Sequence, residues 1–394
     1  MNVLAAWDLG GNWGHVARDL PVLQRLQAEG IDARYAARDA NTAPALAASI
    51  GIPCVAAPTG AAPRRMPRGL AGYAAMLFAD GFGDAMVLDQ RLAGWMRLFA
   101  EHKTDVLLAD YAPAALLGAR VAGIPSVAMG SGFEIPPDTV ELPSFLTDAN
   151  RDAPARRFSE GLVLFNVNRV LRALGAPPLE RLAQVFQGQR NVLTTVAELD
   201  HCGARPDATY AGPLQHLPGG VAAIWKGMTG PRVLVYLRGV DPAVGHVLQA
   251  LDAIGAEVIA VLPDVGSPLR HPHADLQVFR QPVRFDGLIE TADLVIASGS
   301  GTVTTASIAG VPVLVLPANA EQAMLGRRVE DAGVGIAVGN GSTTTVADTI
   351  HHLLSDASFR STARALAAKY AGLETDSAVR TVIDAIRHVS SGHP

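Results

Sequence analysis

Short apolar segments alternate with longer helix-like segments along most of this chain. In the first half the apolar segments cover residues 2–7, 32–37, 105–109, 126–130 and 191–194. The second half repeats the pattern at residues 232–237, 257–262, 276–279, 294–297, 313–316 and 335–338. Strands that alternate with helices are typical of parallel α/β sheets. The sequence therefore predicts an α/β protein with two Rossmann-like domains facing across a cleft, in which ligands bind at the carboxyl ends of the strands.

The length and the breaks in periodicity place the domain boundaries. A chain of 394 residues with 49% hydrophobic content can bury two ordinary cores. A stretch rich in Pro and Gly interrupts the pattern near its middle. We expect a first domain at 1–213, a linker at 214–231, a second domain at 232–374, and a final helix and tail at 375–394.

The charge balance and the N-terminus limit the partners. The formal net charge is -5, which gives no general attraction to nucleic acid or anionic membranes. The chain has no apolar run of the roughly 18 residues that suggest a spanning helix, and no basic, signal-like segment follows Met1. Cys54 and Cys202 match no metal or redox spacing. We therefore expect a cytoplasmic protein with reduced thiols, no nucleic-acid partner and no integral membrane segment.

A glycine-rich turn follows the apolar segment 294–297. Ser298, Gly299, Ser300, Gly301 and Thr302 lead from this predicted strand into a helix-compatible stretch. Such a turn lets the backbone approach an anion, which would then be held by the amides at the helix N-terminus. Turns of this kind also occur without a ligand, where they only allow tight packing. Both interpretations remain open on the turn alone.

The residues around this turn resemble a family motif. Gly299, Gly301 and Thr302 are followed by Gly310-Val311-Pro312, Pro317 and Glu321-Gln322. This order resembles the donor-binding signature of nucleotide-sugar-dependent glycosyltransferases of the two-domain GT-B type, specifically the bacterial relatives of the flavonoid and macrolide glycosyltransferases. Ala297 stands where that family usually carries a phosphate-contacting His, and Thr305 where it carries a ribose-binding Glu. The turn also resembles that of the lipid-linked N-acetylglucosaminyltransferase of peptidoglycan synthesis, which lacks that His.

The resemblance implies a set of donor contacts. Residues 298–302 would hold the diphosphate of a nucleoside diphosphate sugar, with UDP or dTDP as its nucleotide and no other cofactor. Glu321 and Gln322 would bind sugar hydroxyls, although Glu321 could also simply favour the helix N-terminus. The segment ending in Val283 would meet the nucleobase. Arg238 follows a predicted strand and could reach the diphosphate, or it could be solvated.

His15 and Asp110 are the candidate catalytic residues. His15 falls near the start of the first predicted helix, where the helix dipole favours the neutral imidazole that a general base requires. Asp110 follows a buried run and should lie at the carboxyl end of a strand, where it could orient the imidazole or cap the next helix. Gly14-His15 and the surroundings of Asp110 resemble the segments that supply the base and its partner in the same family. Asp8 and Asp19 are weaker candidates for the partner of His15. Asp19 is expected on the exposed side of its helix.

The acceptor pocket is expected around the first domain's insertions. Candidate acceptor residues are Trp13 in the first loop, Phe78 in the predicted helix at 70–82, and Phe133 in the loop at 131–152. Residues of this type are also ordinary core residues. The resemblance implies that the C-terminal helix crosses back onto the first domain, and that the acceptor is a small or lipid-like molecule.

These features together predict an inverting glycosyltransferase that needs no metal. The chain offers no Asp-x-Asp pair suited to holding a cation at the diphosphate. A sugar-nucleotide hydrolase and an inactive sugar-nucleotide-binding protein remain the alternative hypotheses, the first because the Gly-His segment also resembles hydrolases of pseudaminic acid synthesis.

Overall fold

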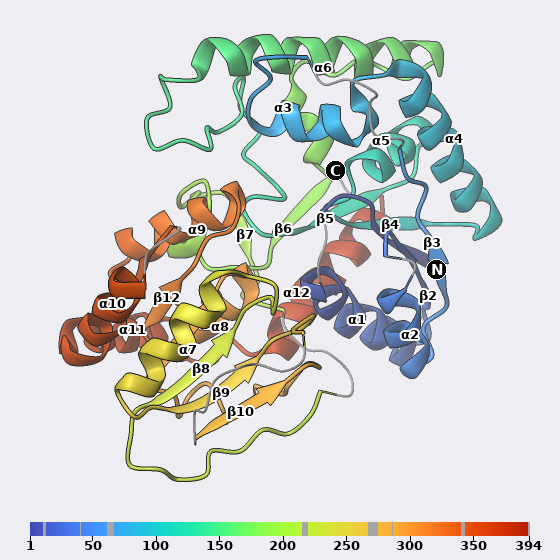
Figure 1. Cartoon of the computed structure of the whole chain (residues 1–394). Helices are drawn as coiled ribbons and strands as arrows, with labels where there is room; N and C mark the ends of the chain where they lie inside the picture. The colour runs from blue at the N-terminus through green and yellow to red at the C-terminus, as the bar shows by residue number, and fades with distance from the viewer. Residues whose placement is uncertain are drawn as a thin grey trace. The chain divides into compact units, whose positions relative to one another are not determined.

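A computed structural model shows two compact α/β units (Figure 1). It describes residues 1–10, 13–39, 41–60, 67–214, 220–266, 275–285, 287–339 and 343–392. Unit 1 comprises Met1–Thr194, Pro206–Leu214 and Asp376–Pro394, and unit 2 comprises Thr195–Arg205 and Gln215–Thr375. Each unit is described by itself below.

Unit 1 is built on a parallel sheet of seven strands in the order β3-β2-β1-β4-β5-β6-β7. The strands are β1 (Asn2–Trp7), β2 (Asp32–Ala37), β3 (Cys54–Ala56), β4 (Val106–Asp110), β5 (Ser126–Gly130), β6 (Arg190–Leu193) and β7 (Thr209–Tyr210). The central strand β4 is fully buried and pairs with β1 on one side and β5 on the other. Its last residue, Asp110, therefore lies at the carboxyl edge beside the ends of both neighbours.

The helices of unit 1 connect and cover these strands (Figure 1). They are α1 (Trp13–Ala28), α2 (Thr42–Ser49), α3 (Gly72–Leu77), the π-helical turn η1 (Phe78–Phe82), α4 (Ala85–Glu101), α5 (Pro113–Ala122), α6 (Ala153–Ala173) and the 3-10 turn η2 (Leu182–Phe186). The predicted helix at 70–82 is thus interrupted, because Gly81 takes a φ of 97° that an α-helix does not allow.

Unit 2 holds a second parallel sheet, in the order β10-β9-β8-β11-β12-β13. Its strands are β8 (Arg232–Tyr236), β9 (Glu257–Val261), β10 (Leu276–Phe279), β11 (Leu294–Ala297), β12 (Val313–Val315) and β13 (Gly335–Ala337). Its helices are η3 (Ala197–Leu199), α7 (Ala243–Ala253), α8 (Ser300–Ile308), α9 (Ala320–Asp331), α10 (Thr343–Ser355) and α11 (Ala357–Lys369). Two parallel α/β sheets agree with the predicted fold class.

Residues before the expected linker, and residues within it, belong to unit 2. Residues 195–205 were expected in the first domain, but Val196 and Leu199 are buried in the core of unit 2. Within the expected linker, the described residues 220–231 pack on unit 2. Val221 forms a parallel bridge with Val283, and the Trp225 indole donates to Thr291 Oγ1 at 3.1 Å. Trp225 is partly buried and packs against the core of unit 2.

The last helix, α12 (Thr375–Ser390), packs on unit 1. One face of this helix is buried, including Val382 and Ile386. Arg387 donates to Glu29 at 2.6 Å, and Glu29 lies just after α1. This placement is the crossing that the resemblance implies. Among the described residues, no helix is long and apolar enough to span a membrane.

Candidate active site

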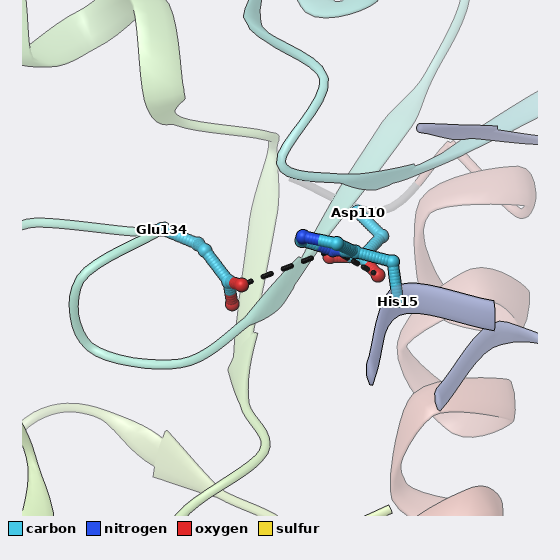
Figure 2. Close-up of side chains that lie close together, drawn as sticks. All are labelled: His15, Asp110 and Glu134. Carbon is cyan, nitrogen blue, oxygen red and sulfur yellow. Dashed lines mark hydrogen bonds and ion pairs between the residues drawn. The ribbon is translucent and has the colours of Figure 1, made fainter. Parts of the chain in front are cut away.

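His15 and Asp110 meet at the carboxyl edge of the unit 1 sheet (Figure 2). His15 lies in the first turn of α1, and Asp110 ends β4. The Nδ1 atom of His15 lies 3.1 Å from Asp110 Oδ2, and their side chains are 8% and 1% exposed. The Trp7 ring stacks on the imidazole with centroids 4.8 Å apart. The structure thus brings together the two residues predicted from the sequence and fixes the plane of the imidazole.

Arg18 and Glu134 complete this cluster and were not predicted. Arg18 Nε and Nη2 donate to Asp110 Oδ2 and Oδ1 at 3.1 and 2.7 Å. Its Nη1 and Nη2 donate to Glu134 Oε2 and Oε1 at 2.7 and 2.9 Å. One arginine therefore holds two carboxylates, each through two hydrogen bonds, which is the geometry in which guanidinium pairs are strongest. The two carboxylates also raise the pKa of Arg18.

The hydrogen bonds of Arg18 favour one tautomer of His15. Arg18 Nη2 lies 3.0 Å from His15 Nδ1, but both of its hydrogens are used by Asp110 Oδ1 and Glu134 Oε1. A proton on Nδ1 fits these contacts, because the Asp110 carboxylate can only accept. In that tautomer Nε2 of the neutral imidazole is the nitrogen that can accept a proton.

The backbone around Nε2 is shaped by Gly10 and Tyr111. Gly10 has a φ of 83°, and a Cβ there would lie 3.1 Å from His15 Nε2 and 3.1 Å from Tyr111 Cδ1. Tyr111 takes a φ of 45°, which is unusual for a residue with a side chain. Its ring stacks with the imidazole at a centroid distance of 6.2 Å. Strained backbone of this kind persists where packing determines it, and it is common at active sites.

Neither of the alternative carboxylates partners His15. Asp8 accepts from the Trp95 indole at 3.0 Å and from the Ala115 amide at 3.1 Å, so it belongs to a different buried network. The expectation that Asp19 lies on an exposed face is wrong, since it is fully buried. Its helix packs against the sheet on that side. Burial and the negative charge of Asp110 raise the pKa of Asp19 well above its usual range.

His15, Asp110 and Glu134 also have the composition of a metal site. One ligand atom from each lies within 4.8 Å of the others. The guanidinium of Arg18 bonds both carboxylates from within this group. The cation that the two carboxylates hold in the structure is therefore the arginine.

Aromatic side chains gather next to the dyad. Phe133 packs against Tyr73, Tyr111 and Phe145, with ring centroids 5.0 to 6.3 Å apart. Phe133 is 5% exposed, so it is a core residue of this cluster as well as a neighbour of the site. Phe78 is buried against Gly83, and Tyr73 from the preceding helix enters the cluster instead. Trp13 opens α1, and its side chain lies outside the described residues.

The glycine-rich turn of unit 2 has the predicted strand-turn-helix form. β11 ends at Ala297, and Gly299 is the N-cap residue of α8. As a glycine it offers no side chain that could accept from the first amides of the helix. The first amides of a helix have no partner inside the helix, so the turn presents Ser300, Gly301 and Thr302 as backbone donors. A Cβ at Gly299 would meet nothing within 4 Å, which leaves room beside them. Ser298 is committed elsewhere, because its hydroxyl donates to Leu316 O at 2.6 Å.

Glu321 and Gln322 lie in the first turn of α9. Asn319, not Glu321, caps this helix by accepting from the Gln322 amide at 3.1 Å. Glu321 Oε1 lies 2.8 Å from His201 Nε2, and the His201 side chain is fully buried. The Gln322 side chain accepts from the Ala318 amide at 2.8 Å. Both predicted residues are thus held by neighbours, and His201, which comes from the segment 195–205, was missed.

The remaining two candidates lie around the same sheet. Tyr236 pairs in register with Ala297, so Arg238 follows the strand end next to the glycine-rich turn. Its guanidinium pairs with Asp264 at 3.1 Å and is 62% exposed. At Val283, the bridge to Val221 uses the flanking carbonyl of Pro282 and amide of Arg284. Because successive peptide groups of an extended chain point to opposite sides, the polar groups of Val283 itself point away from Val221.

Comparison with known proteins places the chain among glycosyltransferases. Residues 245–383 match the family model described as erythromycin biosynthesis protein CIII-like, C-terminal domain. A PGL/p-HBAD biosynthesis glycosyltransferase of Mycobacterium tuberculosis (strain ATCC 25177 / H37Ra) is 26% identical over 312 residues, which are 73% of this chain and 71% of the relative.

Solved glycosyltransferases share the fold over the whole chain. The structure of VinC in complex with dTDP superposes with a TM-score of 0.68 at 17% identity, covering 100% of both chains. The spinosyn rhamnosyltransferase SpnG, complexed with spinosyn aglycone, gives a TM-score of 0.63 at 18% identity, covering 98% of this chain and all of the other. At these identities the likeness establishes the GT-B fold. Residues 245–383 are therefore similar to the EryCIII-like C-terminal domain, and the chain is a glycosyltransferase with the GT-B fold.

Proposed function

We propose that this protein transfers a sugar from a nucleoside diphosphate sugar to an acceptor hydroxyl with inversion at the anomeric carbon. The observation that carries this proposal is the contact of His15 Nδ1 with Asp110 at 3.1 Å, which would leave Nε2 as the proton acceptor. Nε2 would take the proton of the acceptor O–H while the oxygen attacks the anomeric carbon. The bond from that carbon to the diphosphate would break in the same step, and the configuration would invert.

The leaving diphosphate would be held by the N-terminus of α8. The first-turn amides of Ser300, Gly301 and Thr302 and the helix dipole are suited to a developing negative charge. Ala297 contributes no charge here, so the amides would do this work without the family's usual His. A metal ion is then not required, and activity should survive an excess of chelator.

The donor would be a dTDP- or UDP-sugar. VinC was solved with dTDP and SpnG with an aglycone, which favours dTDP among the candidates and a small organic acceptor. Glu321 and Gln322 would bind sugar hydroxyls, Val283 the nucleobase through its backbone, and Arg238 the diphosphate if it left Asp264. Tyr73 and Phe133 mark the wall of unit 1 at which the acceptor would be bound, a wall that also fits a lipid-like acceptor.

A panel of donors and acceptors tests this function. The protein is incubated with dTDP- and UDP-sugars, with and without phenolic, polyketide-type or lipid acceptors, and products are identified by mass spectrometry and by the anomeric coupling in NMR spectra. The proposal predicts an acceptor-dependent product of inverted configuration, with or without EDTA. Release of free sugar without an acceptor would support a hydrolase. Nucleotide binding without any product would support an inactive binding protein.

A further inference from the structure

Besides His15 and Asp110, the buried cluster contains a second charged pair, Arg18 and Glu134. Asp110 Oδ2 lies 3.1 Å from the Nδ1 atom of His15 and would stabilise an imidazolium. Arg18 Nη2 lies 3.0 Å from the same nitrogen. A positive charge at that distance opposes protonation of the ring about as strongly as Asp110 favours it. With these three residues alone, proton uptake by His15 would create an uncompensated buried positive charge.

Glu134 restores the charge balance of the cluster. Its Oε1 lies 3.8 Å from His15 Nδ1, and its side chain is 12% exposed (Figure 2). With Glu134 included, the cluster carries one net negative charge when His15 is neutral, and it becomes neutral when His15 takes a proton. Arg18 lowers the pKa of Glu134 to about 2 despite its burial, so this carboxylate stays ionised and is too weak a base to take the proton itself.

The loop after β5 is built to hold Glu134 in this position. The Ser131 amide donates to Glu134 Oε2 at 2.5 Å. A Cβ on Gly130 would lie 2.8 Å from the same oxygen, so the side chain folds closely over the strand end. Two hydrogen bonds from Arg18 complete its contacts. The carboxylate is thus fixed by backbone and side chain together.

Other groups near His15 leave this charge count unchanged. Burial and Asp110 raise the pKa of Asp19 well above its usual range, and burial raises the pKa of Tyr35, so both shifts favour the uncharged forms. Trp7 and Tyr111 contribute the rings that stack with the imidazole. The described titratable and charged groups that contact His15 are Arg18, Asp110, Tyr111 and Glu134, while Asp19 and Tyr35 interact with Asp110.

We propose that Glu134 is a positioning residue for the sugar transfer, and that it supplies the negative charge that lets His15 accept the acceptor's proton beside Arg18. Arg18 holds the carboxylates of Asp110 and Glu134 in place beside the imidazole. This inference rests on the proposed function. In the step itself the proton moves from the acceptor oxygen to His15 Nε2, the acceptor oxygen bonds to the anomeric carbon, and the diphosphate leaves with the electron pair. Glu134 exchanges no proton.

The test compares Glu134→Gln with Glu134→Asp. The Gln variant removes the charge and keeps one of the two oxygens that accept from Arg18, while the Asp variant keeps the charge on a shorter side chain. We expect kcat/KM for transfer to fall roughly 10- to 100-fold in Glu134→Gln, the scale of a weakened general base. The acid limb of the pH–rate profile should move to lower pH, because the imidazolium is less stabilised. Glu134→Asp should recover part of the rate and the wild-type profile.

Glu160→Gln is the matched control. Glu160 is another buried Glu of unit 1, on α6, and it accepts from the Leu142 amide instead of an arginine. Its variant should transfer sugar at the wild-type rate. The inference is overturned if Glu134→Gln stays within threefold of wild type, or if the Gln and Asp variants lose activity equally with no change in the pH profile, since that pattern marks a purely structural role.

A second measurement separates this inference from the proposed function. Histidine-selective NMR follows the His15 imidazole, assigned with His15→Ala, as a function of pH in wild type and Glu134→Gln. We expect titration at lower pH in the Gln variant even if no transfer activity is found. Absence of transfer in wild type would refute the proposed function alone, and identical titration in the two proteins would refute the role of Glu134 alone.

Discussion

Replacing Asp110 with Asn tests the geometry of the dyad, since it changes one atom and almost no volume. Arg18 donates to both oxygens of Asp110, at 2.7 Å to Oδ1 and 3.1 Å to Oδ2. An amide nitrogen cannot accept from Arg18, so the Asn side chain would keep its oxygen at the shorter contact, the Oδ1 position, and place its nitrogen at the Oδ2 position. From there it would donate to His15 Nδ1, which moves the ring proton to Nε2. The base would then carry a hydrogen on the atom that must accept one.

The size of the effect follows from the distances. An imidazolium and a carboxylate 3.1 Å apart attract each other by about 5 kcal/mol at an effective dielectric constant of about 20. The proton is only partly transferred in the transition state, so roughly half of this, about 2.5 kcal/mol, should appear in the barrier, which is a factor of about 10² in rate. The unfavourable tautomer adds to this loss. We expect kcat to fall by about 10² to 10⁴.

The assay is the initial rate of glycoside formation with saturating donor and acceptor. Calorimetry with the free nucleoside diphosphate serves as the control and should give wild-type affinity, because Asp110 belongs to unit 1 and the proposed diphosphate site to unit 2. Thermal unfolding should change little, since Arg18 keeps both hydrogen bonds to Glu134. A variant that retains more than about a tenth of the wild-type kcat would refute the assignment of Asp110.

Three further predictions concern other parts of the chain. Gly299→Val should leave the fold intact, because a Cβ there meets nothing within 4 Å, yet calorimetry should show at least about tenfold weaker nucleoside diphosphate binding; unchanged affinity would mean that the turn is only structural. His201→Phe should weaken binding of the nucleotide sugar but not of the free diphosphate, since Glu321 loses its partner, and equal weakening of both would contradict this role. Burial raises the pKa of Glu160 to about 7. The stability that the protonated carboxyl contributes is therefore fully present below about pH 4.5 and is lost as the pH rises through 7, because the unfolded chain ionises first. Glu160→Gln should therefore raise the melting temperature more at pH 8 than at pH 5, and an equal change at both would contradict that pKa.

The sequence predicted the sheets well because their strands are buried on both faces. Strands such as β1, β5 and β11 were predicted with the observed ends, since a buried parallel strand is a short apolar run bounded by turn residues. β3 and β7 were missed. They are three and two residues long, too short to show any periodicity, and they form only because a neighbouring strand offers an edge.

The candidate site could be predicted only in part. His15 and Asp110 follow from local signals, one at a helix start and the other at a strand end. Arg18 lies three residues after His15, on the same helix face, so helical spacing could have identified it. Glu134 and His201 lie in irregular segments whose positions depend on long-range packing, and no local pattern marks them. Asp19 was misplaced because an acidic residue on a helix usually faces solvent, whereas this helix buries that face.

The most direct measurement of the central claim is the transfer rate of His15→Ala beside its affinity for a nucleoside diphosphate. If His15 is the general base, transfer should fall by about 10² to 10⁴, and calorimetry should give the wild-type dissociation constant, because the substitution removes a proton acceptor in unit 1 and leaves the turn at Gly299 unchanged. A variant that transfers sugar at more than about a tenth of the wild-type rate would contradict the account.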